Sequence, residues 1–486
     1  MLNLYGIKIK EKKMKEIRQE NKMGTMKIPK LLFSISIPII ISMLVQALYN
    51  IVDAFFVGQY DQLKTEANAL LGTDRVAGTE ALGFAFPIQM LMIAVATGLG
   101  VGMNALLSRA LGQKDKKRAD IIAGQGMFLV GAAYILFLAF GIFFTEFFVS
   151  VQSNEGSLSY QYGVDYISIV SIFSIGVFIQ VTTERLLQAT GKSLLSMITQ
   201  LSGAITNIVL DPILIFGYLG APEMGIKGAA IATVIGQGVA AVTGIILNLA
   251  ANKEITLRLK NFIPRGRLLG EILVIGIPAV LMQAIGSVMT FTMNIILKPF
   301  DAVAVFAVYF KLQSFVFMPV FGLNNGMIPI IAYNYGARKK ERIYATMKLS
   351  AITAVCYMLL GFAIFQIFPA ELLGIFNDSM TVIGVPALRI ISISFMLAGF
   401  SIVSISTCQA LGKSIYSLIV SVIRQLVMLI PAAYLLSLAG NVDVIWWAFP
   451  IAELVGCTCC ILFVLHVLRS TLGKKAMPRA EKNIAK

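Results

Sequence analysis

Apolar residues gather in twelve long runs along the chain, and short polar stretches separate these runs. Runs of roughly 20 to 30 apolar residues are long enough to cross a bilayer as α-helices. The pattern therefore predicts an all-α polytopic membrane protein with twelve transmembrane helices. We place the spans near residues 31–58, 79–108, 121–149, 162–190, 194–218, 227–250, 271–297, 304–333, 349–369, 384–411, 415–438 and 444–468.

Composition supports this prediction and excludes a soluble domain. The 486 residues are 57% hydrophobic and only 13% charged, with a mean hydropathy of +0.82. Soluble proteins carry about 25% charged residues. The first 30 residues are basic and polar, and the first apolar run is too long for the core of a cleavable signal peptide.

Basic residues are distributed unevenly between the two sides of the predicted membrane. Of the 40 lysines and arginines, 33 fall in the two tails and alternate connections, and four fall in the other connections. The positive-inside rule then places both termini in the cytoplasm, in the plasma membrane of a bacterium-like cell. This bias explains the net charge of +15 without a nucleic-acid partner.

The two halves of the chain repeat one another. The segment from Ala85 resembles the segment from Tyr309, and 188–193 (QATGKS) recurs as 409–414 (QALGKS). Each half holds six spans, so both copies enter the membrane from the same side and are related by a pseudo-twofold axis along the membrane normal. The pairs at a constant offset of 224 are Phe86 and Phe310, Gln89 and Gln313, Gly98 and Gly322, Gly102 and Gly326, Met103 and Met327, and Gly112 and Gly336.

This repeat divides the chain into lobes. Ile37-Pro38 recurs as Ile277-Pro278 at an offset of 240, so the loop near 61–76 is an insertion without an assigned role. Each proline either kinks its helix or is simply tolerated in the bundle. The predicted parts are a basic tail 1–30, an N-lobe 31–250, a basic loop 251–270, a C-lobe 271–468 and a tail 469–486.

Polar residues interrupt the first span on one side only. Gln46, Asn50 and Asp53 are spaced at i, i+4 and i+7, which places them on one helical face. An ionisable group inside a membrane costs at least about 2.5 kcal/mol, so it marks a functional site. We predict that Asp53 binds the ion or proton of a secondary transporter, with Gln46 and Asn50 as supporting polar groups.

Several stretches resemble the multidrug and toxic compound extrusion (MATE) family. They are IPIIISMLVQALYNIVDAFFVGQ from Ile37, ALGFAFPIQ from Ala81, SRALGQKDKKRA from Ser108, NIVLDPILIFG from Asn207 and GIKGAAIATVIGQ from Gly225. The resemblance covers residues 30–470 and both halves. It implies two six-helix lobes in a V shape, and export of cationic or amphipathic compounds in exchange for Na⁺ or H⁺.

The resemblance also implies a site. One branch of the family uses an Asp on span 1, an Asn and an Asp on span 5, and a Thr on span 6. The matching residues here are Asp53, Asn207, Asp211 and Thr233. Another branch uses acidic residues on spans 7 and 10, but 272–297 and 386–411 contain none. The N-lobe site is therefore the one we expect.

The predicted topology supports the same cluster, because all four residues fall at one depth in the outer half of the membrane. Two close carboxylates in a low dielectric do not both ionise readily, so the pair suits a proton carrier. With the added Asn and Thr oxygens it also suits Na⁺, whose only expected ligands are Asp53, Asn207 and Asp211. The alternative is structural: Asp211 caps or kinks a helix before Pro212, while Asn207 bonds backbone.

Weaker candidates lie elsewhere in the spans. Glu184 stands beside Arg185 near the cytoplasmic end of span 4, where a loop-side ion pair is the first interpretation and a cavity role the second. Glu453 on span 12 is expected to pair with Arg424 or Arg389 between helices. The other possible cavity residues are Gln180, Met282, Met289 and Met293, and for the methionines ordinary packing is the alternative.

Other classes of function lack support. Gly191-Lys192-Ser193 is like the end of a phosphate-binding loop, but Leu186 stands where the upstream glycine is required. We expect no ATP, no cofactor besides H⁺ or Na⁺, and no enzymatic activity. The expected partners are small-molecule substrates and the lipid bilayer, with the protein acting as a monomer. Alternatives are a flippase or exporter of lipid-linked or metabolite substrates and, in another class, a membrane sensor or scaffold.

Overall fold

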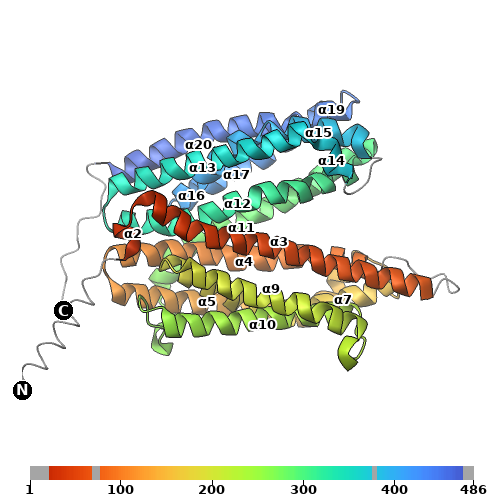
Figure 1. Cartoon of the computed structure of the whole chain (residues 1–486), viewed down its shortest axis with the longest axis horizontal. Helices are drawn as coiled ribbons and strands as arrows, with labels where there is room; N and C mark the ends of the chain where they lie inside the picture. The colour runs from red at the N-terminus through yellow and green to blue at the C-terminus, as the bar shows by residue number, and fades with distance from the viewer. Residues whose placement is uncertain (1–20, 68–76, 375–379, 474–486) are drawn as a thin grey trace, which may run out of the picture.

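A computed structural model describes residues 21–67, 77–374 and 380–473 of the chain, and the folded part is helical (Figure 1). Ten helices are long and apolar enough to cross a membrane, and two bent pairs bring the number of spans to twelve. The prediction of twelve transmembrane helices is thereby confirmed. The N-lobe spans are α3 (Ile28–Ala67), α4 (Ala77–Gly112), α5 (Lys116–Phe143), α7 (Leu158–Ile172) with α8 (Ile175–Ala189), α9 (Ser193–Phe216) and α10 (Ile226–Ala251).

The C-lobe follows the same order. Its spans are α11 (Gly266–Leu297), α12 (Val303–Gly336), α13 (Lys340–Ile367), α15 (Thr381–Ser392) with α16 (Phe395–Ala410), α17 (Ser414–Val422) continuing through η5 (Ile423–Leu429) and α18 (Ile430–Ser437), and α20 (Ala448–Leu472). Short helices between them are α6 (Thr145–Ser150), η1 (Tyr218–Gly220), η2 (Leu259–Phe262), η3 (Lys298–Phe300), α14 (Pro369–Gly374) and α19 (Val442–Ile445).

The two bent spans occupy corresponding places in the lobes. The fourth span bends by 46° between α7 and α8, and the tenth by 49° between α15 and α16. A serine stands at each break, Ser174 and Ser394, and the hydroxyl of Ser394 donates to the carbonyl of Ile391 at 2.7 Å. Such side-chain bonds compete with the helical ladder and favour a bend.

The lobes contact each other through small residues that the sequence repeat had paired. Gly98 and Gly102 of α4 lie against α11, while Gly322 and Gly326 of α12 lie against α3. A Cβ atom at Gly322, for example, would stand 2.7 Å from the Cα atom of Ile40. The partners are Val280 and Gly276 on α11, and Ile40 and Ser36 on α3, which differ by the offset of 240.

One further glycine pair stands close to the pseudo-twofold axis. A Cβ atom at Gly112 would collide with the carbonyl oxygen of Tyr333, and one at Gly336 with that of Arg109. These four residues are related by the same offset of 224, so each lobe makes the same contact with the other. Reciprocal contacts of this kind are the signature of twofold symmetry.

The contacts lie toward one end of the bundle, which we call the basic end. The connections 113–115, 252–265 and 337–339 lie at this end, as does the end of α20 (Figure 1). Toward the opposite end the ribbons of the two lobes diverge in the view of Figure 1. The arrangement agrees with the V shape that the family resemblance implied.

The N-terminal segment 21–26, which contains α2 (Lys22–Thr25), bridges the lobes at the basic end. The side chain of Asn21 donates to Glu254 of the N-lobe at 3.0 Å. The carbonyl of Met23 accepts from Asn334 and from Arg342 of the C-lobe, both at 3.0 Å. The predicted tail 1–30 therefore ends in a packed segment, and its first 20 residues lie outside the described part.

Two predicted boundaries shift in the structure. The expected loop 61–76 begins in helix, because α3 continues to Ala67, and its residues 68–76 lie outside the described part. Asp61 stabilises this extension by accepting from the amides of Gly78 and Thr79 at 2.9 and 2.8 Å, at the start of α4. The connection between the lobes, expected at 251–270, is shorter because α11 begins at Gly266.

Candidate ion and ligand sites

Three of the four predicted cluster residues lie together between α9 and α10. The amide nitrogen Nδ2 of Asn207 donates to Asp211 Oδ1 at 3.1 Å and to Thr233 Oγ1 at 3.5 Å. Asp211 is fully buried, and Asn207 and Thr233 expose 3% and 7% of their surface. The i, i+4 spacing on α9 places the Asn and the Asp on the face that packs on α10.

Two glycines bring these helices close enough for the bond to form. A Cβ atom at Gly236 of α10 would stand 3.1 Å from the Cβ atom of Asn207, and one at Gly203 would stand 2.8 Å from the carbonyl oxygen of Gly236. Any larger residue would push α10 away from α9. The glycines thus set the spacing at which Thr233 meets Asn207.

The fourth residue, Asp53, reaches the cluster from α3. Helices α3 and α9 pack together, and the carboxylate charges of Asp53 and Asp211 interact electrostatically. Among the described residues, the buried atoms Asp53 Oδ1, Asn207 Oδ1 and Asp211 Oδ2 have no hydrogen-bond partner. Buried acceptors without partners are rare and costly, at about 1–3 kcal/mol each. These oxygens fit a group that brings positive charge, either a proton or Na⁺.

The structural alternative for Asp211 is not what the structure shows. Helix α9 continues through Pro212 to Phe216, so Asp211 does not cap its end. Asn207 directs its side-chain donor to Asp211 and Thr233 rather than to backbone.

Three residues near the cluster escaped the sequence analysis. Tyr49, one turn before Asp53 on α3, feels the charges of Asp53 and Asp211. Tyr166 of α7 is 1% exposed, accepts from Gln89 Nε2 of α4 at 3.1 Å and also contacts Thr233. The i, i+4 spacing of Tyr49 and Asp53 was a readable signal, whereas nothing in the sequence pattern distinguishes Tyr166.

Gln180 and Glu184 belong to a second polar group beside the cluster. Gln180 Nε2 donates to Glu184 Oε1 at 3.1 Å and to Gln200 Oε1 at 2.9 Å. A cavity of about 20 Å³ lies between this group and Asn207, lined also by Tyr49. A cavity of this size holds about one water molecule. Glu184 therefore lies beside the N-lobe cavity, as its second interpretation expected.

The loop-side ion pair expected between Glu184 and Arg185 is wrong, because the two side chains have other partners in the described structure. The guanidinium of Arg185 donates to Gln188 Oε1 at 3.1 Å and to Asn325 Oδ1 of α12 at 3.0 Å. Arg185 thus links the two lobes in a buried position. Neighbours in a helix point to different sides, and here those sides have different contacts.

The remaining candidates are dispersed. Gln46 is half-buried on α3, and the side chain of Asn50 lies outside the described part. Met293 is fully buried in the core, and Met282 accepts a weak bond from Gln409 Nε2 at 3.7 Å. Met289 lines a cavity in the C-lobe. Ordinary packing thus accounts for Met293.

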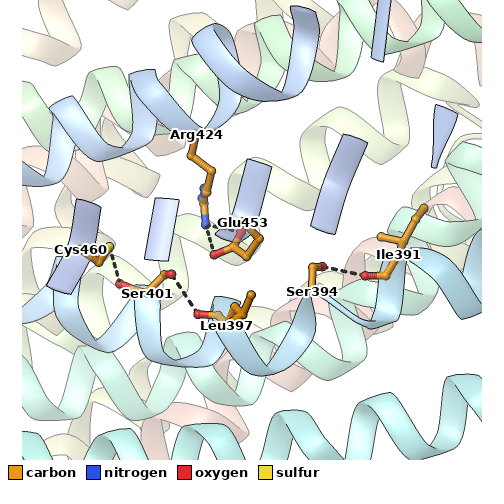
Figure 2. A network of polar contacts seen from close by, with 7 residues as sticks. All are labelled: Ile391, Ser394, Leu397, Ser401, Arg424, Glu453 and Cys460. Carbon is orange, nitrogen blue, oxygen red and sulfur yellow. Dashed lines mark hydrogen bonds and ion pairs between the residues drawn. The ribbon is translucent and has the colours of Figure 1, made fainter. Parts of the chain in front are cut away.

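The expected inter-helix pair in the C-lobe is confirmed. Arg424 Nη1 of η5 lies 3.2 and 3.4 Å from the two carboxylate oxygens of Glu453 on α20 (Figure 2). Arg389 contributes only its backbone carbonyl, which accepts from Gln366 and Ser392. The pair lies at the wall of a cavity of about 300 Å³.

The fold and its buried polar cluster define a polytopic membrane transporter with two related lobes. The family model MatE matches residues 38–213 and 278–435, one segment in each lobe. The chain belongs to this family, the multidrug and toxic compound extrusion family, whose members are membrane transporters rather than enzymes.

Curated relatives and solved structures agree with this assignment. The chain is 28% identical over 454 residues to the multidrug export protein MepA of Staphylococcus haemolyticus, covering 91% of this chain and 94% of the relative. It is 25% identical over 451 residues to MepA of Staphylococcus aureus strain MRSA252, covering 91% and 94%.

Two solved structures share the fold. One is a MATE protein in complex with MaL6, with a TM-score of 0.84 at 24% identity, covering 94% of this chain and 99% of the other. The second is an outward-facing multidrug resistance MATE family transporter of the MOP superfamily, with a TM-score of 0.82 at 24% identity and the same coverage.

Proposed function

We propose that this protein is a secondary active multidrug exporter of the plasma membrane, acting as a monomer. It moves cationic or amphipathic organic compounds out of the cell in exchange for H⁺ or Na⁺, by alternating access between its two lobes. The name multidrug export protein, carried by the MepA relatives, supports export of several compounds. The observation that carries ion exchange is the pair of buried carboxylates, Asp53 and Asp211, with oxygens that lack hydrogen-bond partners.

Helix α3 connects this pair to the contact between the lobes. Asp53 lies on α3, and Ser36 and Ile40 of the same helix pack against α12 of the C-lobe. The distance along the helix from residue 40 to residue 53 is about 20 Å. Pro38, between the two contact residues, interrupts the hydrogen-bond ladder and provides a point where the helix can bend.

Coupling then follows from charge. A proton or Na⁺ at the cluster removes the repulsion between Asp53 on α3 and Asp211 on α9. This lets α3 move closer to α9 and bend near Pro38, so the N-lobe cavity shrinks and substrate leaves. The ion drives this change only because it binds one conformation more tightly than the other.

The direct test is efflux of ethidium from vesicles that contain the purified protein. We expect an imposed gradient of either Na⁺ or pH to drive ethidium movement, and the absence of that gradient to stop it. The two gradients are imposed separately, so the result also identifies the coupling ion. Ethidium movement that is independent of both gradients would refute ion-coupled export.

Orientation in the membrane is tested separately. The basic connections near 109–120, 251–270 and 336–348 should face the cytoplasm, because 33 of 40 basic residues fall on their side. In a cysteine-free background, a cysteine replacing exposed Lys116 should escape an impermeant thiol reagent applied to intact cells. A cysteine replacing exposed Asn154, after the third span, should react. The opposite labelling pattern would reverse the orientation.

A further inference from the structure

The cavity of about 300 Å³ in the C-lobe is separate from the N-lobe cluster and combines aromatic walls with both signs of charge. It lies between α11, α12, α16, η5 and α20. Its polar groups include the ion pair of Arg424 and Glu453. Its apolar wall includes Met289, Tyr309, Phe310, Phe317, Phe321 and Phe449.

The ion pair leaves much of the guanidinium available. A guanidinium has five N–H donors, but among the described residues Arg424 bonds only through Nη1, to Glu453. The distances of 3.2 and 3.4 Å exceed the usual 2.7–2.9 Å of charge-assisted bonds. The Arg424 side chain is 21% exposed and the Glu453 side chain 10%. Arg424 therefore has donors to offer a ligand while it remains beside Glu453.

Two backbone features hold Arg424 at the cavity wall. It is the second residue of η5, a π-helical stretch that ends just before Pro431. Proline has no N–H and needs room in the preceding turn, and π-helical turns are common at functional sites. On α20, Gly456 has no side chain, and a Cβ atom there would stand 3.0 Å from Cδ of Arg424.

The charges indicate what such a cavity binds. Its formal charges cancel, so a ligand with one net charge would leave one member of the pair opposed by a like charge. A ligand with a carboxylate and a cationic nitrogen gives each member an opposite partner. Its aromatic skeleton would pack on the phenylalanines, whose faces also attract the cation.

We propose that this C-lobe cavity is a second ligand site, and that it takes aromatic zwitterions. The ligand's carboxylate bonds the free donors of Arg424, and its cationic nitrogen lies near Glu453. This site goes beyond the ion-coupled export proposed above, because it can bind ligand whether or not the N-lobe cluster drives transport.

The test is fluorescence anisotropy of two dyes with purified full-length protein in detergent. Rhodamine 110 carries a carboxylate and a delocalised cation, and rhodamine 123 is its methyl ester, which keeps only the cation. We expect rhodamine 110 to bind at least about tenfold more tightly, since only its carboxylate can accept from Arg424. Equal affinities of the two dyes for the wild-type protein would overturn the proposal.

Variants assign the preference to the cavity. The double variant Arg424→Gln with Glu453→Gln should bind both dyes equally, and it removes both buried charges together, which proteins tolerate better than the loss of one. If this variant does not fold, Gly456→Ala, which displaces the Arg424 stem, should weaken only rhodamine 110. A dye preference that persists in the folded double variant, or in Gly456→Ala, would contradict the proposal.

The matched control is Asp53→Asn, which changes a carboxylate in the other lobe. It should keep the dye preference even if it stops ion-driven efflux. Failure of the export proposal and failure of the C-lobe site therefore give different results. A preference that is lost in Asp53→Asn and kept in the double variant would place the zwitterion in the N-lobe instead.

Discussion

Replacing either Asp53 or Asp211 with asparagine should reduce ion-driven ethidium efflux to the background of protein-free vesicles. Each substitution keeps the size of the side chain but removes a negative charge that the coupling ion neutralises. Because the charges of Asp53 and Asp211 interact, the loss of one also changes how the other binds the ion. The measurement is the initial efflux rate at equal amounts of reconstituted protein.

Asp165→Asn is the matched control for these variants. Asp165 is an aspartate of the same lobe that forms a half-exposed ion pair with Lys227 at 3.1 Å. Such surface pairs contribute about 0–1 kcal/mol, so efflux should stay near the wild-type rate. If the Asp53 and Asp211 variants pump normally while a C-lobe variant such as Glu453→Gln stops efflux, the ion site lies in the wrong lobe of our proposal.

The difference between the lobes explains why these two positions are singled out. At the repeat offsets, Asp53 corresponds to Met293, and Asn207 and Asp211 correspond to Met428 and Ala432. Met293 is fully buried in the C-lobe core. The lobes share a backbone plan, but the oxygen-bearing side chains of the cluster have no counterparts in the second lobe.

Valine at Gly112 or at Gly336 should open the contact between the lobes at the basic end. The added side chain would collide with the carbonyl oxygen of Tyr333 or of Arg109, and backbone atoms of packed helices cannot move aside cheaply. The protein should therefore shift toward conformations in which the basic ends separate. Electron–electron resonance distances between spin labels at Lys117 and Glu341 should lengthen, and efflux should fall because one conformation is lost.

Gly131→Val on α5 is the control for this prediction. No atom lies within 4 Å of a Cβ atom built at Gly131, so this valine carries the same helix-propensity change without the collision. The five native cysteines are replaced before labelling. Unchanged distances in both the Gly112 and the Gly336 variants would show that this contact does not hold the lobes together.

The sequence by itself determined the number of spans, the division into two lobes and the related glycines. These features follow from periodicity along one chain, because a bilayer requires apolar runs of a fixed length and a repeat preserves its offset. The position of Asn207 and Asp211 on one face also follows from spacing alone. Asp53 stood out because a carboxylate in an apolar run is costly.

Only the tertiary structure decided which groups from different helices meet. Spacing gives the face of a helix but not its rotation toward a neighbour, so the contact of Tyr166 with Thr233 and the bond from Arg185 to Asn325 were not predictable. For the same reason the sequence paired Glu184 with the adjacent Arg185, although their side chains leave the helix in different directions. The C-lobe cavity likewise exists only because five separate helical segments pack around Arg424 and Glu453, and packing of that kind depends on side-chain shapes that no single segment specifies.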